Sequence, residues 1–249
     1  LSALGEYPAV FEDRVLTKTI NSAHIFAAKV YIRGIQRQVY VDGRLWLHPY
    51  NVLHNAQIAD NGDLLIPYME KIYAKIVGNY EAMTGGNAYE VFNLLLGSPN
   101  LYLFFDDPEI GYDYTSATRT AAKTQIWNLI KQADDNGWLL AASCYTSGSV
   151  NLVSNHLYTL VKYIDVGGIQ LVILRNPWGE ERFTGKYSKT STLWTCELSD
   201  AIDPNFDPTL DDGWIALTMD ELIDHFNILE IAHYDPAAVQ STFEIIDFQ

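Results

Sequence analysis

The hydrophobic pattern changes its period along the chain, and this change constrains the fold more than any other feature of the sequence. Between residues 65 and 80 the apolar side chains recur on one helical stripe, which comprises Leu65, Met69, Ile72, Tyr73, Ile76 and Tyr80. Beyond the Gly-Ser-Pro-Asn break at 97–100, most apolar segments are strand-like. We therefore expect an α+β fold, with a helical lobe over residues 1–100 and a β-rich lobe over residues 101–249.

The first lobe is predicted to contain several short elements around the long helix. These are a helix at 9–15, strands at 24–33 and 38–41, a turn at 42–43 and a helix at 89–96. The polar run at 60–63 is a candidate cap for the long helix, and Gly85-Gly86 is its predicted end.

The second lobe is predicted to hold one long helix and several strands. The helix carries Ala122, Ile126, Leu129, Ile130 and Ala133 and ends at Asn136-Gly137. The remaining predicted elements are strands at 138–145, 156–165, 169–175, 214–218 and 229–233 and a helix at 219–226. Gly167-Gly168 predicts a hairpin between two of these strands, and residues 197–213 are typical of an acidic, turn-rich connection.

Composition excludes several classes of function. The 16 basic and 31 acidic residues give a formal net charge of −15, which repels phosphate backbones, so we expect no nucleic-acid partner. No apolar run approaches the roughly 18 residues that a membrane span needs, so we predict no transmembrane segment. Two cysteines are too few for a disulfide framework, which favours an intracellular, cytoplasmic location.

The predicted hairpin carries a polar pair. One strand opens with His156, and the other is followed by Asn176. A histidine held by an Asn carbonyl is fixed in tautomer without a carboxylate beside it, as a thiolate–imidazolium nucleophile requires. A two-residue turn would pair His156 with Gly179 and leave Asn176 three positions away, about 10 Å along a strand. We expect a bulge or asymmetric loop in 163–169 to close this gap. From these residues alone, a buried His with a structural Asn and a catalytic pair both remain open.

Several motifs in the same order resemble the calpain protease core, which is the calpain form of the papain-like cysteine protease fold. They are RNPWGE at 175–180, FTGKY at 183–187, EKIYAK at 70–75 with YEAMTGG at 80–86, NGWLL at 136–140, DDG at 211–213 and LEI at 229–231. The resemblance covers nearly the whole chain and implies two lobes with a cleft between them.

The resemblance also implies roles for three residues. His156 would be the general base and acid, Asn176 would orient it, and Trp178 would shield their hydrogen bond from water. The nucleophilic cysteine would be expected about two helical turns before Leu1. Cys144 and Cys196 are interpreted as buried, inert thiols, because neither is predicted to start a helix whose dipole would lower its pKa.

The family resemblance further implies one Ca²⁺ in each lobe. Glu90 matches a carboxylate of the first-lobe site, whose other ligands would lie upstream of Leu1, and Asp212 matches one of the second-lobe site. At the other second-lobe positions this chain has Arg182, Lys189 and Trp214, so we expect that site to be degenerate, because two cations repel a divalent ion. Surface turn acids are the alternative interpretation of Glu90 and Asp212.

Three functional hypotheses follow. The first is a calpain-like cysteine endopeptidase core that hydrolyses extended protein segments by a Cys-His-Asn mechanism. The second is a catalytically inactive calpain-like domain that acts as an interaction or scaffold module for protein partners in a larger assembly. The third is a binding module with an apolar cleft. Residues 1–4 have the pattern of a helix interior with no cap before it, and 243–249 resemble the start of a linker, so we expect a longer multidomain chain.

Overall fold

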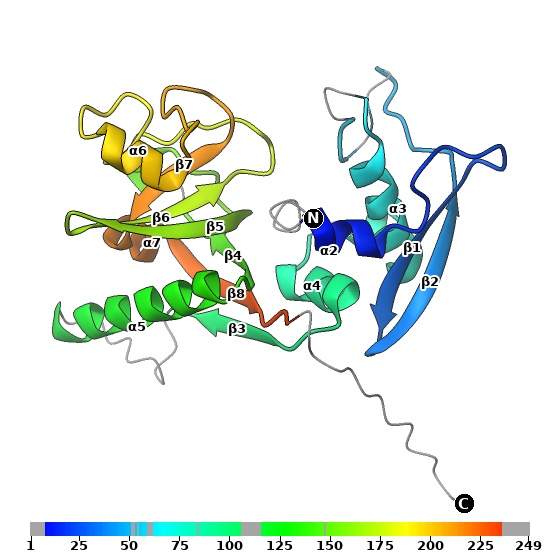
Figure 1. The fold of residues 1–249 in the computed structure, drawn as a ribbon, viewed down its shortest axis with the longest axis horizontal. Coiled ribbons are helices and arrows are strands. Elements are labelled where there is room, and N and C mark those ends of the chain that lie inside the picture. Colours follow the sequence, from blue (N-terminus) through cyan, green and yellow to red (C-terminus); the bar gives the residue numbers. More distant parts are fainter. Residues whose placement is uncertain are drawn as a thin grey trace, which may run out of the picture. The chain divides into compact units, whose positions relative to one another are not determined.

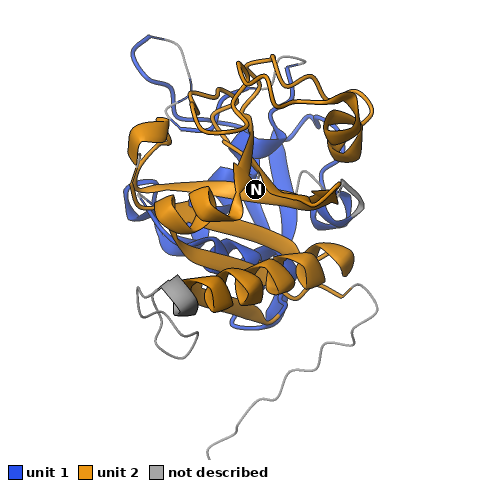
Figure 2. Ribbon diagram, turned by 90° about the vertical axis from the view of Figure 1, so that its left-hand side faces the viewer, with its two compact units in different colours: residues 1, 3–98, 236–249 blue, residues 2, 99–235 orange. Residues whose placement is uncertain are grey.

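The computed structural model describes residues 8–50, 53, 55–58, 62–83, 85–105, 116–146 and 148–235. It divides the chain into two compact units (Figures 1 and 2). Among the described residues, the first unit ends at Ser98 and the second runs from Pro99 to Asp235. The predicted helix at 1–4 and the predicted linker at 243–249 lie outside the described residues.

The first unit combines helices with a small antiparallel sheet. Its elements are α2 (Pro8–Arg14), β1 (Ile25–Ile32), β2 (Ile35–Asp42), α3 (Leu65–Val77), a 3₁₀ turn (Glu81–Met83) and α4 (Ala88–Leu96). The strands β1 and β2 pair along their whole length, and α4 and α3 pack against them. The buried side chains that form this core include Phe26, Val30, Met69, Ile72, Phe92 and Leu96.

Two boundaries in this unit differ from the prediction. The helix α3 ends at Val77 rather than at Gly85-Gly86, because Gly78 adopts a positive φ of 122° and its N–H bonds the carbonyl of Ala74. Strands β1 and β2 meet at a tight turn, Arg33-Gly34, in which both residues have positive φ. This turn was not predicted, since an Arg-Gly pair is a weaker turn signal than Asn-Gly or Asp-Gly.

The second unit is built on a six-stranded antiparallel sheet with the order β3-β8-β4-β5-β6-β7. Its strands are β3 (Asn100–Phe104), β4 (Leu139–Cys144), β5 (His156–Val166), β6 (Ile169–Arg175), β7 (Trp214–Thr218) and β8 (Phe226–Ala232). Its helices are α5 (Ser116–Asp135), α6 (Cys196–Ile202) and α7 (Met219–His225), with a 3₁₀ turn at Gly148–Val150. The predicted α+β fold class is therefore confirmed.

Helices cover both faces of this sheet (Figure 1). The larger core lies on the face covered by α5 and α7, where Ile126, Ile130 and Leu222 pack against strand residues such as Leu160 and Leu174. The smaller core lies on the other face, where α6 contributes Leu198 and Ile202. Because β6 sends alternate side chains into the two cores, it is buried on both faces.

The short helix α6 corrects the prediction of an irregular loop over 197–213. Thr195 caps it, since its hydroxyl accepts a hydrogen bond from the N–H of Leu198 at 3.2 Å. Its C-terminal carbonyls, those of Ala201 and Ile202, accept hydrogen bonds from the Lys162 ammonium. A seven-residue acidic helix has little periodicity of its own, and these tertiary contacts stabilise it.

Candidate active site

The hairpin of β5 and β6 sets the relative position of His156 and Asn176. Its turn is Gly167-Gly168, as predicted, with Val166 paired to Ile169. A bulge interrupts the ladder between Leu160 and Lys162, which leaves Val161 as the extra residue. The predicted location of the irregularity, 163–169, is therefore wrong.

The bulge has a direct consequence for the side chains. Without it, Asn176 would lie opposite Thr159 and would face away from His156. With it, the register of Thr159 with Arg175 places Asn176 beside Tyr158, on the face that His156 shares. Two residues of offset remain, and a diagonal pair on one face of a sheet is within reach of long side chains.

A hydrogen bond closes this remaining distance and defines the histidine tautomer. The Nε2 of His156 lies 2.9 Å from Oδ1 of Asn176. The amide nitrogen of Asn176 donates to the carbonyl of Glu180 at 3.0 Å, so its oxygen faces the imidazole. Because that oxygen can only accept, Nε2 carries the proton and Nδ1 is the basic nitrogen of the neutral ring. Among the described residues, no group forms a hydrogen bond with Nδ1.

Two aromatic rings flank the imidazole. The indole of Trp178 lies 4.4 Å from it between ring centroids, and the ring of Tyr158 lies 5.0 Å away at 83°. Trp178 is 61% exposed, so the indole covers the imidazole at the surface of the protein. Its backbone N–H also donates to Oδ1 of Asn176 at 3.1 Å.

The electrostatics of the site favour the neutral imidazole. Burial lowers the pKa of His156 below its ordinary value of 6.5, and the hydrogen bond to Asn176 opposes this shift. Burial also raises the pKa of Tyr158 to about 12, so its phenol stays protonated. That phenol lies close to the backbone N–H of Val153, whose hydrogen bond of 2.9 Å ties the chain before β5 to the site.

Asn176 is 4% exposed and is fixed from two directions. Its backbone N–H donates to the carbonyl of Gly213 at 2.7 Å, which extends the ladder between β6 and β7. Gly213 has a φ of +87°, and a Cβ there would lie 2.8 Å from the Asn176 carbonyl oxygen. Only glycine permits this approach, so the motif Asp211-Asp212-Gly213 supports Asn176 directly.

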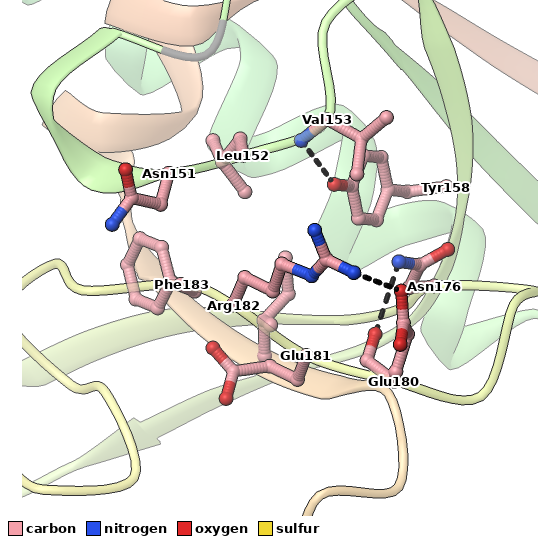
Figure 3. A pocket seen from close by; sticks show the side chains of 10 residues that line it. Asn151, Leu152, Val153, Tyr158, Asn176, Glu180, Glu181, Arg182 and Phe183 are labelled. Carbon is pink, nitrogen blue, oxygen red and sulfur yellow. Dashed lines mark hydrogen bonds and ion pairs between the residues drawn. The ribbon is translucent and has the colours of Figure 1, made fainter.

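A small, partly open pocket lies on the Glu180 side of Asn176 (Figure 3). Its lining residues are Asn151, Leu152, Val153, Tyr158, Asn176, Glu180, Glu181, Arg182, Phe183 and Ile215. Figure 3 shows the hydrogen bond from the Asn176 amide to Glu180 and the ion pair between Arg182 and Glu180. His156 does not line this pocket, so we assign no reacting group to it.

Comparison with known proteins gives the family of this chain. Residues 1–233 match the calpain family cysteine protease domain. The chain belongs to the calpain family. It is 28% identical to calpain-8 of Mus musculus, over 94% of this chain and 33% of that protein. It is 28% identical to the calpain-1 catalytic subunit of Bos taurus, over 76% of this chain and 26% of that protein. It is 26% identical to the calpain-type cysteine protease ADL1 of Oryza sativa, over 75% of this chain and 9% of that protein. The chain thus spans a third or less of the length of these relatives.

The two cysteines of this calpain-family chain differ from each other. Cys144 is buried, as predicted, and burial raises the pKa of its thiol to about 11. Cys196 is exposed and is the first residue of α6, so the predictions that it is buried and that it does not start a helix were wrong. Thr195 was not recognised in the sequence as a helix cap, and therefore no helix start was predicted at Cys196. Since α6 covers the face opposite to that of Tyr158 and His156, Cys196 is not placed to serve the imidazole.

The predicted calcium residues occupy ordinary structural positions. Glu90 is exposed in the first turn of α4, and its Oε2 lies 3.4 Å from the Tyr73 hydroxyl. Asp212 accepts a hydrogen bond from the N–H of Trp214 at 3.2 Å, as turn acids do. Within the described part of the chain, no group of three or more His, Cys, Asp and Glu side chains could hold a metal ion.

The sequence prediction missed an acidic cluster beside Asp212. Glu181 is a buried carboxylate, and burial is the main reason that its pKa is raised. The ammonium of Lys189 lies 3.9 Å from its Oε2 and 3.6 Å from Oδ2 of Asp211. These residues do not fit the second-lobe calcium site that the family implies, because the Lys189 ammonium already lies beside the Glu181 and Asp211 carboxylates and would repel a divalent ion. No periodicity or spacing in the sequence distinguishes Glu181 as a buried carboxylate. Its partner Lys189 was recognised only as a departure from the family's calcium-site pattern.

None of the helices that the structure describes is both long enough and apolar enough to span a membrane.

Proposed function

We propose that this chain carries the general base of a calpain-type cysteine endopeptidase that hydrolyses peptide bonds by a Cys-His-Asn mechanism. The observation that supports it best is the pair formed by His156 and Asn176. The Nε2 proton of His156 is held by Asn176, and Nδ1 is left as the acceptor for a thiol proton.

The reaction would follow from this arrangement. A cysteine thiol transfers its proton to Nδ1 of His156, and the thiolate attacks the peptide carbonyl carbon. As the C–N bond breaks, the imidazolium returns that proton to the leaving amine, and an acyl thioester remains. Water then attacks the thioester, its proton passing through Nδ1 to the departing thiolate.

The nucleophile of this proposal is a cysteine other than Cys144 and Cys196. Cys144 is buried with a raised pKa, and Cys196 belongs to the helix on the other face of the sheet. The proposal also assigns roles to two neighbours. Asn176 orients the imidazole, and Trp178 limits access of water to their hydrogen bond.

We further propose that the protein is a longer, multidomain, intracellular protease that acts on extended protein segments. The share of each relative that the chain covers supports the greater length. The net charge of −15 argues against nucleic acid as a partner.

The alternative is a catalytically inactive calpain-like domain that binds protein partners. The presence of Lys189 and Arg182 at the implied calcium positions favours it, because a protease without that calcium needs another means of holding its site together.

One experiment separates the two functions. The full-length protein, His156→Ala and Asn176→Ala are assayed with an unfolded protein substrate and with an epoxysuccinyl thiol reagent. His24→Ala is the matched control, because His24 is an exposed histidine in the first unit. Cleavage that is lost in His156→Ala, reduced by at least about tenfold in Asn176→Ala and unchanged in the control supports the protease. Absence of both cleavage and labelling in the wild-type protein supports the inactive domain.

A further inference from the structure

Lys189 joins the two segments that hold Asn176. Its ammonium donates to the backbone carbonyl of Glu181 at 3.3 Å and lies within 4 Å of the Glu181 and Asp211 carboxylates. Asp211 in turn accepts a hydrogen bond from the N–H of Glu181 at 2.6 Å. The segment after β6 and the turn before β7 are thus connected by the Lys189 side chain and by a hydrogen bond from the Glu181 N–H to the Asp211 carboxylate.

Burial makes the ammonium necessary here. The Glu181 side chain is 2% exposed, and the groups that favour its charged form are the Lys189 ammonium and, to a smaller extent, the backbone N–H of Phe183. Lys189 is the only cation among those residues within 4 Å of it. Removing the ammonium leaves the buried Glu181 charge with only the Phe183 N–H to stabilise it, which costs more than loss of a surface ion pair.

Both connected segments contact Asn176 directly. Glu181 follows Glu180, whose carbonyl orients the Asn176 side-chain amide at 3.0 Å. Asp211 precedes Gly213, whose carbonyl accepts the Asn176 backbone N–H at 2.7 Å. A shift of either segment would move the amide oxygen that holds Nε2 of His156.

We infer that Lys189 is a positioning residue whose ammonium replaces a bound divalent cation as the link between these two segments, so that the pairing of His156 with Asn176 is independent of calcium. This inference depends on the proposed function only in so far as the pair of His156 and Asn176 is taken to be catalytic. The exposed ion pair between Arg182 and Glu180 lies within one of these segments and is not part of the link.

The test compares three variants of the full chain. Lys189→Met keeps an unbranched side chain, shorter by the ammonium nitrogen, and removes the charge, whereas Lys189→Arg keeps the charge. Lys186→Met is the matched control, because it removes the same charge from the same segment at an exposed position, where the ammonium pairs with no carboxylate of the described residues. Each protein is measured with a chelator and with about 1 mM calcium, the weak end of protein calcium affinities.

Two readouts do not depend on catalysis. Amide hydrogen exchange is measured at Glu181 and Trp178, whose N–H groups donate to Asp211 and Asn176. The tautomer of His156 is measured from its ring ¹⁵N shifts. In Lys189→Met we expect exchange at both amides to be faster by roughly tenfold or more, and a mixture of tautomers in place of the Nε2–H form. Lys189→Arg and Lys186→Met are expected within about twofold of the wild type.

Either of two results would overturn the inference: unchanged exchange and tautomer in Lys189→Met, or calcium that slows exchange at Glu181 in the wild-type protein. If the wild-type protein cleaves no substrate while Lys189→Met still loses protection and the single tautomer, only the proposed function fails.

Discussion

The Nε2 atom of His156 lies 2.9 Å from Oδ1 of Asn176, and the nitrogen of the same amide is committed to the carbonyl of Glu180. The hydrogen bond to Glu180 shows that the amide oxygen, and not the amide nitrogen, faces the imidazole, so Nε2 of His156 must be the donor. A neutral partner thus holds the imidazole without adding a charge that would raise its pKa.

Replacing that neutral partner by a charged one is expected to reverse the direction of the His156 pKa shift. In the wild-type protein the pKa lies below 6.5, mainly because of burial. Asn176→Asp places a carboxylate at hydrogen-bond distance and is expected to raise it above that value, by about 1–3 pH units relative to the wild type. Titration of the His156 ring protons by NMR measures this. Asn151→Asp, which adds the same charge next to Thr184, should leave the pKa unchanged.

The same substitution should invert the contribution of His156 to stability. A lowered folded pKa means that the unfolded chain binds the proton more readily, so wild-type stability falls as the pH drops below about 6.5. With a raised pKa, as in Asn176→Asp, the contribution is present below that pH and is lost as the pH rises through the folded pKa. Urea unfolding of both proteins across this range gives the difference. Parallel stability curves would contradict the pKa assignment.

Trp178 is expected to affect hydration of the pair more than stability. Since the indole is 61% exposed, Trp178→Ala should lower the free energy of unfolding by only about 1 kcal/mol. Its loss admits water to the imidazole and should move the His156 pKa upward, toward 6.5, because burial is the main cause of the lowered value. Trp178→Phe, which retains a ring against the imidazole, is the control. A pKa that falls further in Trp178→Ala would exclude the shielding role.

The sequence predicted those parts of the fold that local chemistry determines. Gly167-Gly168 marks its turn because both residues need positive φ, and β6 has the length and composition of a buried strand. The bulge at Val161 was not placed correctly, since one extra residue leaves the alternation intact on either side of it. That bulge nevertheless decides whether Asn176 and His156 share a face.

The residues of the candidate site were predicted from the sequence, whereas the contacts that hold them in place were predicted only in part. Asn176 and Trp178 lie within the RNPWGE motif, and His156 opens the preceding strand of the hairpin, so a resemblance could select all three. The contacts of Lys189 with Asp211, and of Gly213 with Asn176, join residues that are distant in sequence. Such tertiary contacts leave no periodic signal in the sequence.

The two cysteines are expected to react very differently with a maleimide at about pH 7. A thiol pKa of about 11 leaves only about one part in ten thousand of Cys144 as thiolate, and its side chain is also buried. Cys196 is exposed and should be modified in the folded protein. Peptide mapping by mass spectrometry distinguishes the two sites, and unfolding in urea should make Cys144 reactive. Modification of Cys144 at the rate of Cys196 in the folded state would show that its environment is not closed.

Gly213 offers the clearest test of how closely the turn before β7 supports Asn176. A methyl group there would meet the Asn176 carbonyl oxygen at 2.8 Å and Cα of Gly179 at 3.1 Å, in addition to the cost of a φ of +87°. Gly168→Ala is the matched control, because its φ is +82° and nothing lies within 4 Å of the new methyl. We expect Gly168→Ala to cost about 1 kcal/mol of unfolding free energy, and Gly213→Ala about 3 kcal/mol.

The difference of about 2 kcal/mol between these variants isolates the close approach from the backbone strain that both share. Gly213→Ala should also displace the Asn176 amide, so the Nε2–H tautomer of His156 should lose its dominance in this variant and persist in Gly168→Ala. Urea unfolding and ring ¹⁵N shifts measure the two effects separately. Equal losses of stability with an unchanged tautomer would mean that the turn tolerates a side chain and does not position Asn176.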